Sequence, residues 1–404
     1  MNEKRPYTIL CLANACKGAP FVVEAKQQGC YIILLTNEEH GDEAWPHDSI
    51  DEFYKMPDIS VQPAITYAVS YLARGRKIDS IVALDDYDVA TAASLREHLR
   101  LPGMGESGAR YFRDKLGMRV RAQSQGILQP PFTAVFNYDD LRIFMADVAP
   151  PWVLKPRFEA GAVGIQKLSD AVAVWRALEN LGDKQSYYLL EQFLPGDVYH
   201  VDTLMWQGEP LFALVSKYGA PPLSLTQGGG IFNTRILARE SDEAQMVLAA
   251  NKQLLNALQH PGGAAHTEFI RAHADGRFYF LETAARVGGA NIDKMVKAAT
   301  GIDLWAEAAR IELAKLRGEA YELPPHRNDY AALITCLARQ EHPDLSTYTD
   351  AEIVWRLDKP YHAGFLLASP DAGRIEELLG NYNGRFAQEF LHHQQSSKKA
   401  RTTF

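Results

Sequence analysis

The sequence predicts an α/β protein in which a small parallel α/β domain is followed by strand-rich α+β regions. Three observations support this prediction. Apolar runs alternate with helical patterns near the N-terminus, strands then dominate in pairs, and a Pro-Pro pair at 324 and 325 sets off a last, shorter α+β region. A chain of 404 residues has room for two to four domains of roughly 100–200 residues.

The N-terminal region has the pattern of a βαβ unit. Two apolar runs rich in β-branched residues, 7–13 (YTILCLA) and 31–36 (YIILLT), are separated by a Gly-Ala-Pro turn and a helical stretch. A helix over 64–76 leads into the strand IDSIVAL, and another amphipathic helix follows it. This alternation predicts a parallel α/β domain over residues 1–108.

Three further parts follow along the chain. A helix around 109–119 opens a part that extends to residue 190. Residues 191–318 contain paired strands, among them YHVDTLMW and the pair AAHTEFIR and RFYFLETA, and close with a helix at about 302–317. Residues 319–404 predict a small α+β cap with a frayed polar tail, QQSSKKARTTF.

Composition excludes several classes of protein. The net charge of −8 and pI near 5.9 leave no basic field for a polyanion, so nucleic acid is not expected as a partner. No apolar run reaches the ~18 residues of a membrane helix. The four cysteines lack C-x-x-C spacing, which argues against a disulfide framework or a zinc site. We therefore expect a cytoplasmic protein with free thiols.

Two carboxylates in the segment AAHTEFIRAHADGRFYFLETAAR point to a metal site. A three-residue hairpin loop ending at Gly276 would pair His273 with Arg277 and place Glu268 directly opposite Glu282. Two glutamates ~5 Å apart repel each other, and Mg²⁺ would remove that cost. A two-residue loop would instead put them on opposite faces, as ordinary solvated side chains.

A lysine and a glycine-rich loop suggest phosphate binding. Lys155 ends the apolar strand PWVLKP, and the following loop carries Gly161 and Gly164, whose flexibility lets backbone N–H groups approach an anion closely. A plain surface hairpin is the alternative.

The segment LLEQFLPGDVYHVD suits a linker that holds adenine with backbone groups and ribose with side chains. Glu191, Asp197, His200 and Asp202 surround its Pro-Gly turn. Each could equally be a solvated loop residue, and His200 a packed histidine.

Arg286 follows Glu282 by four residues and precedes two glycines. It could neutralise charge on a transferred phosphoryl group, or form a structural ion pair with either glutamate.

In this order the motifs resemble the ATP-grasp superfamily, in particular the carboxylate–amine ligase branch that includes bacterial L-amino acid ligases. LDDYDVATAASLREHLRLPG is similar to the end of the family's Rossmann-like preATP-grasp domain, and the likeness continues over almost the whole chain. The resemblance implies an ATP-grasp fold, with a lid subdomain at 109–190, a catalytic subdomain at 191–318 and the small C-terminal cap.

The resemblance also implies roles for individual residues. RDKLGMR resembles the helix with the first nucleotide lysine, and VLKPRFEAGAVGI the second lysine and phosphate loop, while LLEQFLPGD resembles the adenine hinge. HTEF and LETAARVGG resemble the metal-bearing strands. The residues concerned are Lys115, Lys155, Gly161, Gly164, Glu191, Gln192, Phe193, Leu194, Glu268, Glu282 and Arg286.

Two positions depart from the family pattern. Ala284 stands where the second metal strand often has Asn, which leaves the number of metal ions open. Val198 stands where an acidic residue often binds ribose, so Asp197 or His200 is expected to substitute.

The activity implied is ATP-dependent ligation of a small carboxylate, expected to be an amino acid, to an amine. It would need Mg²⁺ or Mn²⁺ and pass through an acyl phosphate that Lys115, Lys155 and Arg286 help to form. The glycine run SLTQGGGIFNTR (224–235) is expected to close over the site, with Arg235 contacting triphosphate or substrate. A homodimer formed through the N-terminal domain is plausible by the same resemblance.

Three alternatives remain. The acceptor could be another nucleophile, a thiol or a bicarbonate-type group, or the chain could be a catalytically weakened ATP-binding module, as Ala284 and Val198 would allow. A dinucleotide-dependent dehydrogenase is disfavoured because LANACKGAP, after the first strand, offers one glycine instead of G-x-G-x-x-G.

Overall fold

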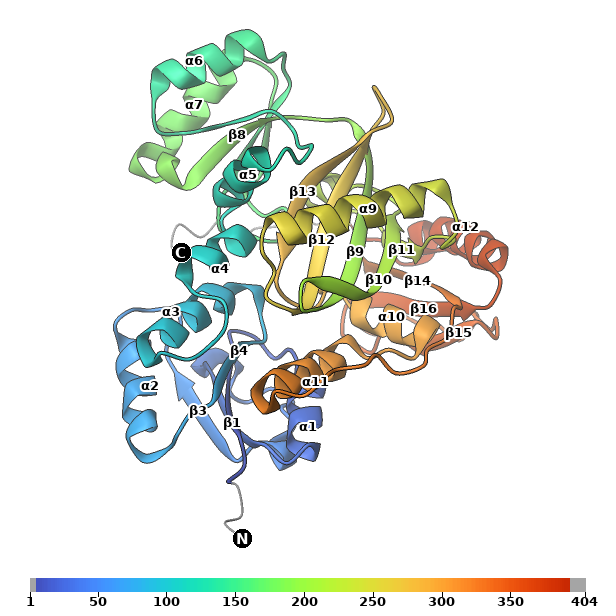
Figure 1. Ribbon diagram of the computed structural model, residues 1–404. Coiled ribbons are helices and arrows are strands. Elements are labelled where there is room, and N and C mark those ends of the chain that lie inside the picture. The colour runs from blue at the N-terminus through green and yellow to red at the C-terminus, as the bar shows by residue number, and fades with distance from the viewer. Residues whose placement is uncertain (1–4, 393–404) are drawn as a thin grey trace.

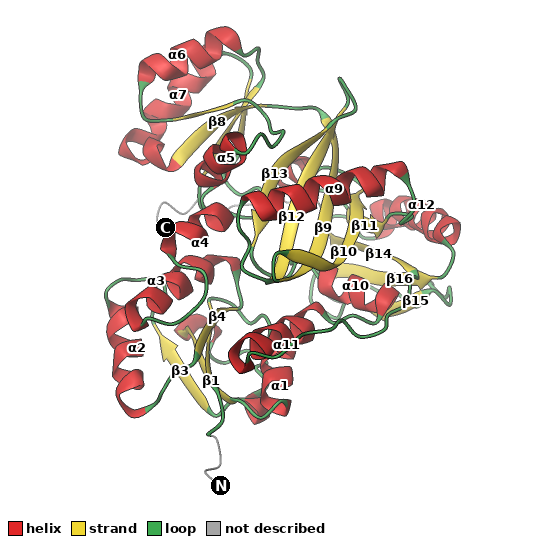
Figure 2. Cartoon of the chain, viewed as in Figure 1, coloured by secondary structure: helices red, strands yellow, loops and turns green. Residues whose placement is uncertain are grey.

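The computed structural model describes residues 5–392 and contains three β-sheets, two of four strands and one of eight (Figure 1). The predicted tail from residue 394 lies outside the described residues. Helices cover the sheets in each part of the chain (Figure 2).

The N-terminal sheet is parallel, with the strand order β3-β2-β1-β4. Its two central strands, β1 and β2, are apolar and buried on both faces, as is typical of parallel sheets. Helices α2 and α3 pack on one face, whereas α1 and the distant α11 cover the other and lie side by side in Figure 1. The elements are β1 Thr8–Ala13, α1 Ala19–Gln27, β2 Tyr31–Asn37, β3 Glu52–Met56, α2 Ala64–Gly75, β4 Ser80–Ala83 and α3 Val89–Leu99.

The helix predicted around 109–119 is two helices, α4 (Glu106–Arg113) and α5 (Lys115–Ser124). Asp114 breaks the run because its backbone is extended and its carboxylate accepts the N–H of Leu116, which makes it the N-cap of α5. The Lys115 N–H bonds instead to the carbonyl of Arg157. Lys115 therefore stands at the first position of a helix that starts beside the loop after β6.

The second sheet is antiparallel, with the order β5-β8-β6-β7. Helices α6 and α7 pack on it, and together they form the upper part of Figure 1. The elements are β5 Phe132–Ala134, α6 Tyr138–Asp147, β6 Trp152–Pro156, β7 Gln166–Leu168, α7 Ala171–Leu181 and β8 Tyr188–Gln192.

The third sheet is antiparallel throughout, with the order β13-β12-β9-β10-β11-β14-β16-β15. The strands of the predicted C-terminal cap belong to it, because β14 pairs directly with β11. The elements are β9 Gly196–Trp206, β10 Glu209–Tyr218, α8 Pro222–Gly228, β11 Phe232–Ile236, α9 Asp242–Ala257, β12 Gly263–Ala272, β13 Phe278–Ala284, α10 Ile292–Thr300, α11 Leu304–Arg317, β14 Tyr330–Leu337, β15 Ile353–Arg356, β16 His362–Ser369 and α12 Ala372–Glu389.

The glycine run expected to be a closing loop is more ordered than predicted. Its first part belongs to the short helix α8, and its last part is strand β11, so only residues 229–231 between them are irregular. No helix within residues 5–392 is both long and apolar enough to cross a bilayer.

Candidate functional site

A cavity of about 390 Å³ lies between the four-stranded antiparallel sheet and the eight-stranded sheet. Side chains or backbone from both sheets, from α5 and from α8 line it. It brings together most of the candidate residues: Lys115, Lys155, Gly161, Glu191, Gln192, Phe193, Leu194, Glu268, Glu282 and Arg286.

Glu268 and Glu282 face each other across β12 and β13, as predicted, but the hairpin reaches this register differently. The Ala272 N–H bonds to the carbonyl of Arg277, so the loop is one residue longer than expected. A bulge that leaves Leu281 without an opposite residue then restores the pairing of the two glutamates.

Each of these carboxylates has a protein partner. The Nζ of Lys115 lies 2.8 Å from Glu282 Oε2, and the hydroxyl of Tyr218 donates to Glu268 Oε1 at 2.9 Å. Burial would raise the pKa of Glu268, but His266 and Tyr218 outweigh it and lower the pKa. The hairpin is thus stable without an ion, and repulsion alone does not require one. Two carboxyl groups beside one cavity do fit a hard divalent cation.

Lys155 is held by a buried ion network. Its Nζ lies 2.6 Å from Glu191 Oε2, and Arg119 Nε lies 2.7 Å from Glu191 Oε1. Burial would raise the pKa of Glu191, but these two cations lower it. The Glu191 carboxylate therefore orients Lys155 and is itself engaged within the protein.

The hinge after β8 has one free backbone donor. The N–H groups of Gln192 and Phe193 bond to the carbonyls of Pro131 and Pro151. Among residues 5–392, no backbone carbonyl accepts from Leu194. The Leu194 N–H can therefore bond to the edge of a planar heterocycle.

The glycine-rich loop contributes Gly161 to the cavity wall, whereas Gly164 does not line it. Gly161 has a φ of +65°, a backbone conformation that residues other than glycine rarely adopt. Its carbonyl lies 3.3 Å from the Thr226 hydroxyl of α8, which can donate either to it or to the Pro222 carbonyl at 3.0 Å. The two segments predicted to cover the site thus touch each other.

Arg286 forms its ion pair with neither glutamate. Its Nε lies 3.7 Å from Oδ1 of Asp86, and neither of these two buried atoms has a hydrogen-bond partner among the described residues. Asp86 is also held by Arg113 at 2.6 Å. Because this contact is loose, Arg286 can turn toward an anion in the cavity.

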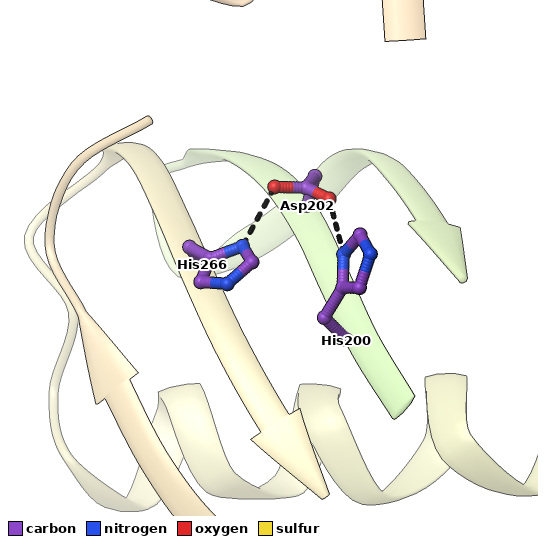
Figure 3. A group of neighbouring side chains, drawn as sticks. All are labelled: His200, Asp202 and His266. Atoms are coloured by element: carbon purple, nitrogen blue, oxygen red, sulfur yellow. Dashed lines mark hydrogen bonds and ion pairs between the residues drawn. The ribbon is translucent and has the colours of Figure 1, made fainter. Parts of the chain in front are cut away.

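Asp197, His200 and Arg235 do not line the cavity. Asp197 pairs with Lys217 at 2.8 Å, and Arg235 pairs with Glu376 of α12. His200 is completely buried. Its Nδ1 bonds to Asp202 (Figure 3) and its Nε2 to Thr234, so it has no free group for a ribose. The structure therefore corrects the expectation that these side chains contact nucleotide or substrate.

The sequence reasoning missed Arg119 and Tyr218. Arg119 lies four residues after Lys115, a spacing that puts both on one face of α5 and could have revealed it. Tyr218 ends the strand after Lys217 and carries no comparable signal.

Comparisons with known proteins agree with this geometry. A model of the ATP-grasp N-terminal domain matches residues 22–103. The solved structure of an L-amino acid ligase from Bacillus licheniformis superposes with a TM-score of 0.74 at 19% identity, over 98% of this chain and 100% of that one. The chain has the ATP-grasp fold.

Two further proteins resemble this chain. The L-arginine-specific L-amino acid ligase of Bacillus subtilis is 25% identical over 270 residues, which are 65% of this chain and 64% of that protein. The match thus spans less than two thirds of that relative's length. The biotin carboxylase domain of a Hydrogenobacter thermophilus 2-oxoglutarate carboxylase, solved with MgADP and bicarbonate, superposes with a TM-score of 0.68 at 14% identity, covering 97% and 91% of the two chains.

The two positions that depart from the ATP-grasp pattern are both buried. Ala284 ends β13 opposite His266, and Val198 lies in β9 opposite Ile270. Neither offers an oxygen to the cavity. A metal ion at this site would rely on Glu268 and Glu282.

Proposed function

We propose that this protein is an ATP-dependent carboxylate–amine ligase that releases ADP and phosphate. The observation that carries the proposal is one cavity in which Glu268 and Glu282 face each other while Lys115, Lys155 and Arg286 line the same walls. Paired carboxylates beside several cations suit a metal-bound polyphosphate. The sequence likeness to an L-amino acid ligase supports amide formation as the outcome.

The nucleotide would be an ATP molecule, with its adenine against residues 192–194. Lys115 and Lys155 would contact the phosphates, and Gly161 would cover them with backbone groups. Glu268 and Glu282 would hold Mg²⁺ or Mn²⁺, which when bound offsets phosphate charge. The MgADP in the biotin carboxylase domain of the same fold supports this assignment.

The chemistry has two steps. A carboxylate oxygen of the first substrate attacks the γ-phosphorus, the bond to the β–γ bridging oxygen breaks, and ADP leaves. The amine nitrogen of the second substrate then attacks the acyl carbon, the acyl–oxygen bond breaks, and phosphate and a proton leave. Lys155 and Arg286 would stabilise charge on the transferring group in the first step. Contact between Thr226 and Gly161 would help to exclude water from the acyl phosphate.

The names of the relatives suggest amino acids as substrates. Both the B. subtilis and the B. licheniformis proteins are described as L-amino acid ligases. We therefore propose that an amino acid supplies the carboxylate and that a second amino acid supplies the amine.

The test is a two-substrate panel. Purified protein with ATP and Mg²⁺ is mixed with all pairs of the common L-amino acids, and ADP, phosphate and product mass are measured. We expect ADP, phosphate and a dipeptide in equal amounts for some pairs, and none from the Glu282→Gln variant. Parallel arms replace the amine by a thiol or by bicarbonate. ADP release with a thiol or bicarbonate alone would contradict the amine as acceptor, and tight MgATP binding without turnover would identify a binding module.

A further inference from the structure

His200, Asp202 and His266 form a buried cluster on the face of the eight-stranded sheet that carries the two glutamates. His200 and Asp202 alternate along β9 and so point the same way. On β12, His266 pairs with Asp202 and Glu268 pairs with His200. The cluster and Glu268 therefore occupy four neighbouring positions of one face.

Asp202 organises this cluster (Figure 3). Its two carboxylate oxygens accept hydrogen bonds from Nδ1 of His200 at 2.8 Å and from Nδ1 of His266 at 2.9 Å. The second nitrogen of His200 is bonded to the Thr234 hydroxyl at 2.7 Å. The second nitrogen of His266 lies 3.9 Å from Oε1 of Glu268. One fully buried carboxylate thus fixes the imidazole that faces a candidate metal ligand.

The cluster is complete without a metal ion. Its three ligand atoms lie within 4.8 Å of one another, which would suit an ion. Both oxygens of Asp202 and both nitrogens of His200 already have partners, however, so an ion would have to displace hydrogen bonds. The cluster is therefore a hydrogen-bonded support for the neighbouring residues and not a metal centre.

The loop after Arg286 rests on the same cluster. A Cβ atom at Gly288 would lie 2.6 Å from Oδ1 of Asp202 and 2.8 Å from Nδ1 of His266. Only glycine allows the loop to approach these two atoms so closely, because hydrogen bonds hold both in place. Asp202 therefore contacts, directly or through His266, the segments that carry Glu268 and Arg286.

We propose that Asp202 is a positioning residue that, through His266 and Gly288, fixes Glu268 and the Arg286 loop for binding of the metal–nucleotide complex. The inference rests on the proposed function in taking Glu268 as a metal ligand. Groups that orient a metal ligand from behind typically contribute 10- to 100-fold in metal affinity or activity. Asp202 does not line the cavity, but it should therefore affect the affinity of the site for Mg²⁺.

The test measures ADP binding by isothermal titration calorimetry while the Mg²⁺ concentration is varied. We expect Asp202→Asn to raise the Mg²⁺ concentration needed for half-maximal binding by about 10-fold or more. Thr267→Val is the matched control. Thr267 is completely buried on β12 between His266 and Glu268, but it points to the other face and bonds to Thr283 at 2.8 Å. It should lower the thermal unfolding midpoint without changing the Mg²⁺ dependence.

Gly288→Ala provides a second test that removes no hydrogen-bonding group. It should shift the Mg²⁺ dependence in the same direction, and it carries the test if Asp202→Asn does not fold. Mg²⁺ dependence equal to wild type in the folded variants would overturn the inference. A stoichiometric transition metal in the purified wild-type protein that is lost in Asp202→Asn would also overturn it, in favour of a metal centre. Failure of the wild type to bind MgADP at all would instead refute the proposed function.

Discussion

Arg119 provides the most quantitative test of how the site is built. Its guanidinium is completely buried, lies 2.7 Å from Glu191 and donates to the carbonyl of Leu281 at 2.7 Å. It joins α5 to β8 and to the residue before Glu282. We predict that Arg119→Met lowers the free energy of unfolding by about 3 kcal/mol.

The magnitude follows from the pairing of Glu191. Removing one partner of a buried ion pair costs ~3–5 kcal/mol because the other charge stays buried. The lower end applies here, since Lys155 remains 2.6 Å from Glu191. At roughly 2 °C per kcal/mol for a large domain, the thermal midpoint should fall by about 6 °C.

The assay is thermal unfolding followed by tryptophan fluorescence, with Arg142→Met as the control. Arg142 pairs with Asp139 on the surface of α6, where both side chains are mostly exposed. Exposed pairs of this kind contribute ~0–1 kcal/mol, so the control should shift the midpoint by at most about 2 °C. Equal shifts in the two variants would refute the claim that Arg119 supports the site from a buried position.

Three other changes test separate parts of the account. Glu282→Gln should reduce turnover at least ~100-fold while folding is kept, because it removes a charged ligand from the phosphate-binding cavity; a rate within 3-fold of wild type would remove Glu282 from the metal site. Arg235→Ala should change turnover less than about 2-fold, since its partner is Glu376 and it does not line the cavity; a large loss would restore Arg235 to the site. Burial and the charge of Lys315 lower the pKa of His260 to about 3, so its contribution to stability is present above pH ~6.5 and is lost as the pH falls below that value. At pH 5 the loss is about 2 kcal/mol, and His260→Gln should lose less stability than wild type between pH 7 and 5 in thermal unfolding experiments.

Local sequence patterns predicted the N-terminal α/β domain and the pairing of the two metal-site glutamates. The parallel N-terminal domain follows from alternating apolar runs, and the structure has it with α2 ending one residue before the predicted end. The pairing of Glu268 with Glu282 was also predicted correctly. The loop is one residue longer than predicted, and the bulge at Leu281 compensates for this shift in register, but no local sequence rule indicates either feature.

Contacts between distant segments could not be predicted. The strands after residue 319 extend the central sheet because β14 pairs with β11, which lies about 100 residues earlier. Arg235 finds its partner, Glu376, 141 residues away. Residue types at these positions carry no information on which strand edge or helix they will meet.

Burial determines which of the polar candidate residues can reach a ligand. His200 and Asp197 stand three residues apart in one motif, yet His200 is completely buried and Asp197 is half-exposed. The sequence shows that both can bind a ligand but not which one the neighbouring strands cover. The contact between His266 and Asp202 could not be predicted either, because 64 residues separate them in the sequence.

The proposed function requires this protein to activate a carboxylate as an acyl phosphate. The most direct measurement follows the oxygen atoms of a substrate amino acid whose carboxylate is labelled with ¹⁸O. The account predicts that each amide formed transfers one labelled oxygen to the released phosphate, with ADP as the other product. Unlabelled phosphate, or label recovered in AMP, would contradict it.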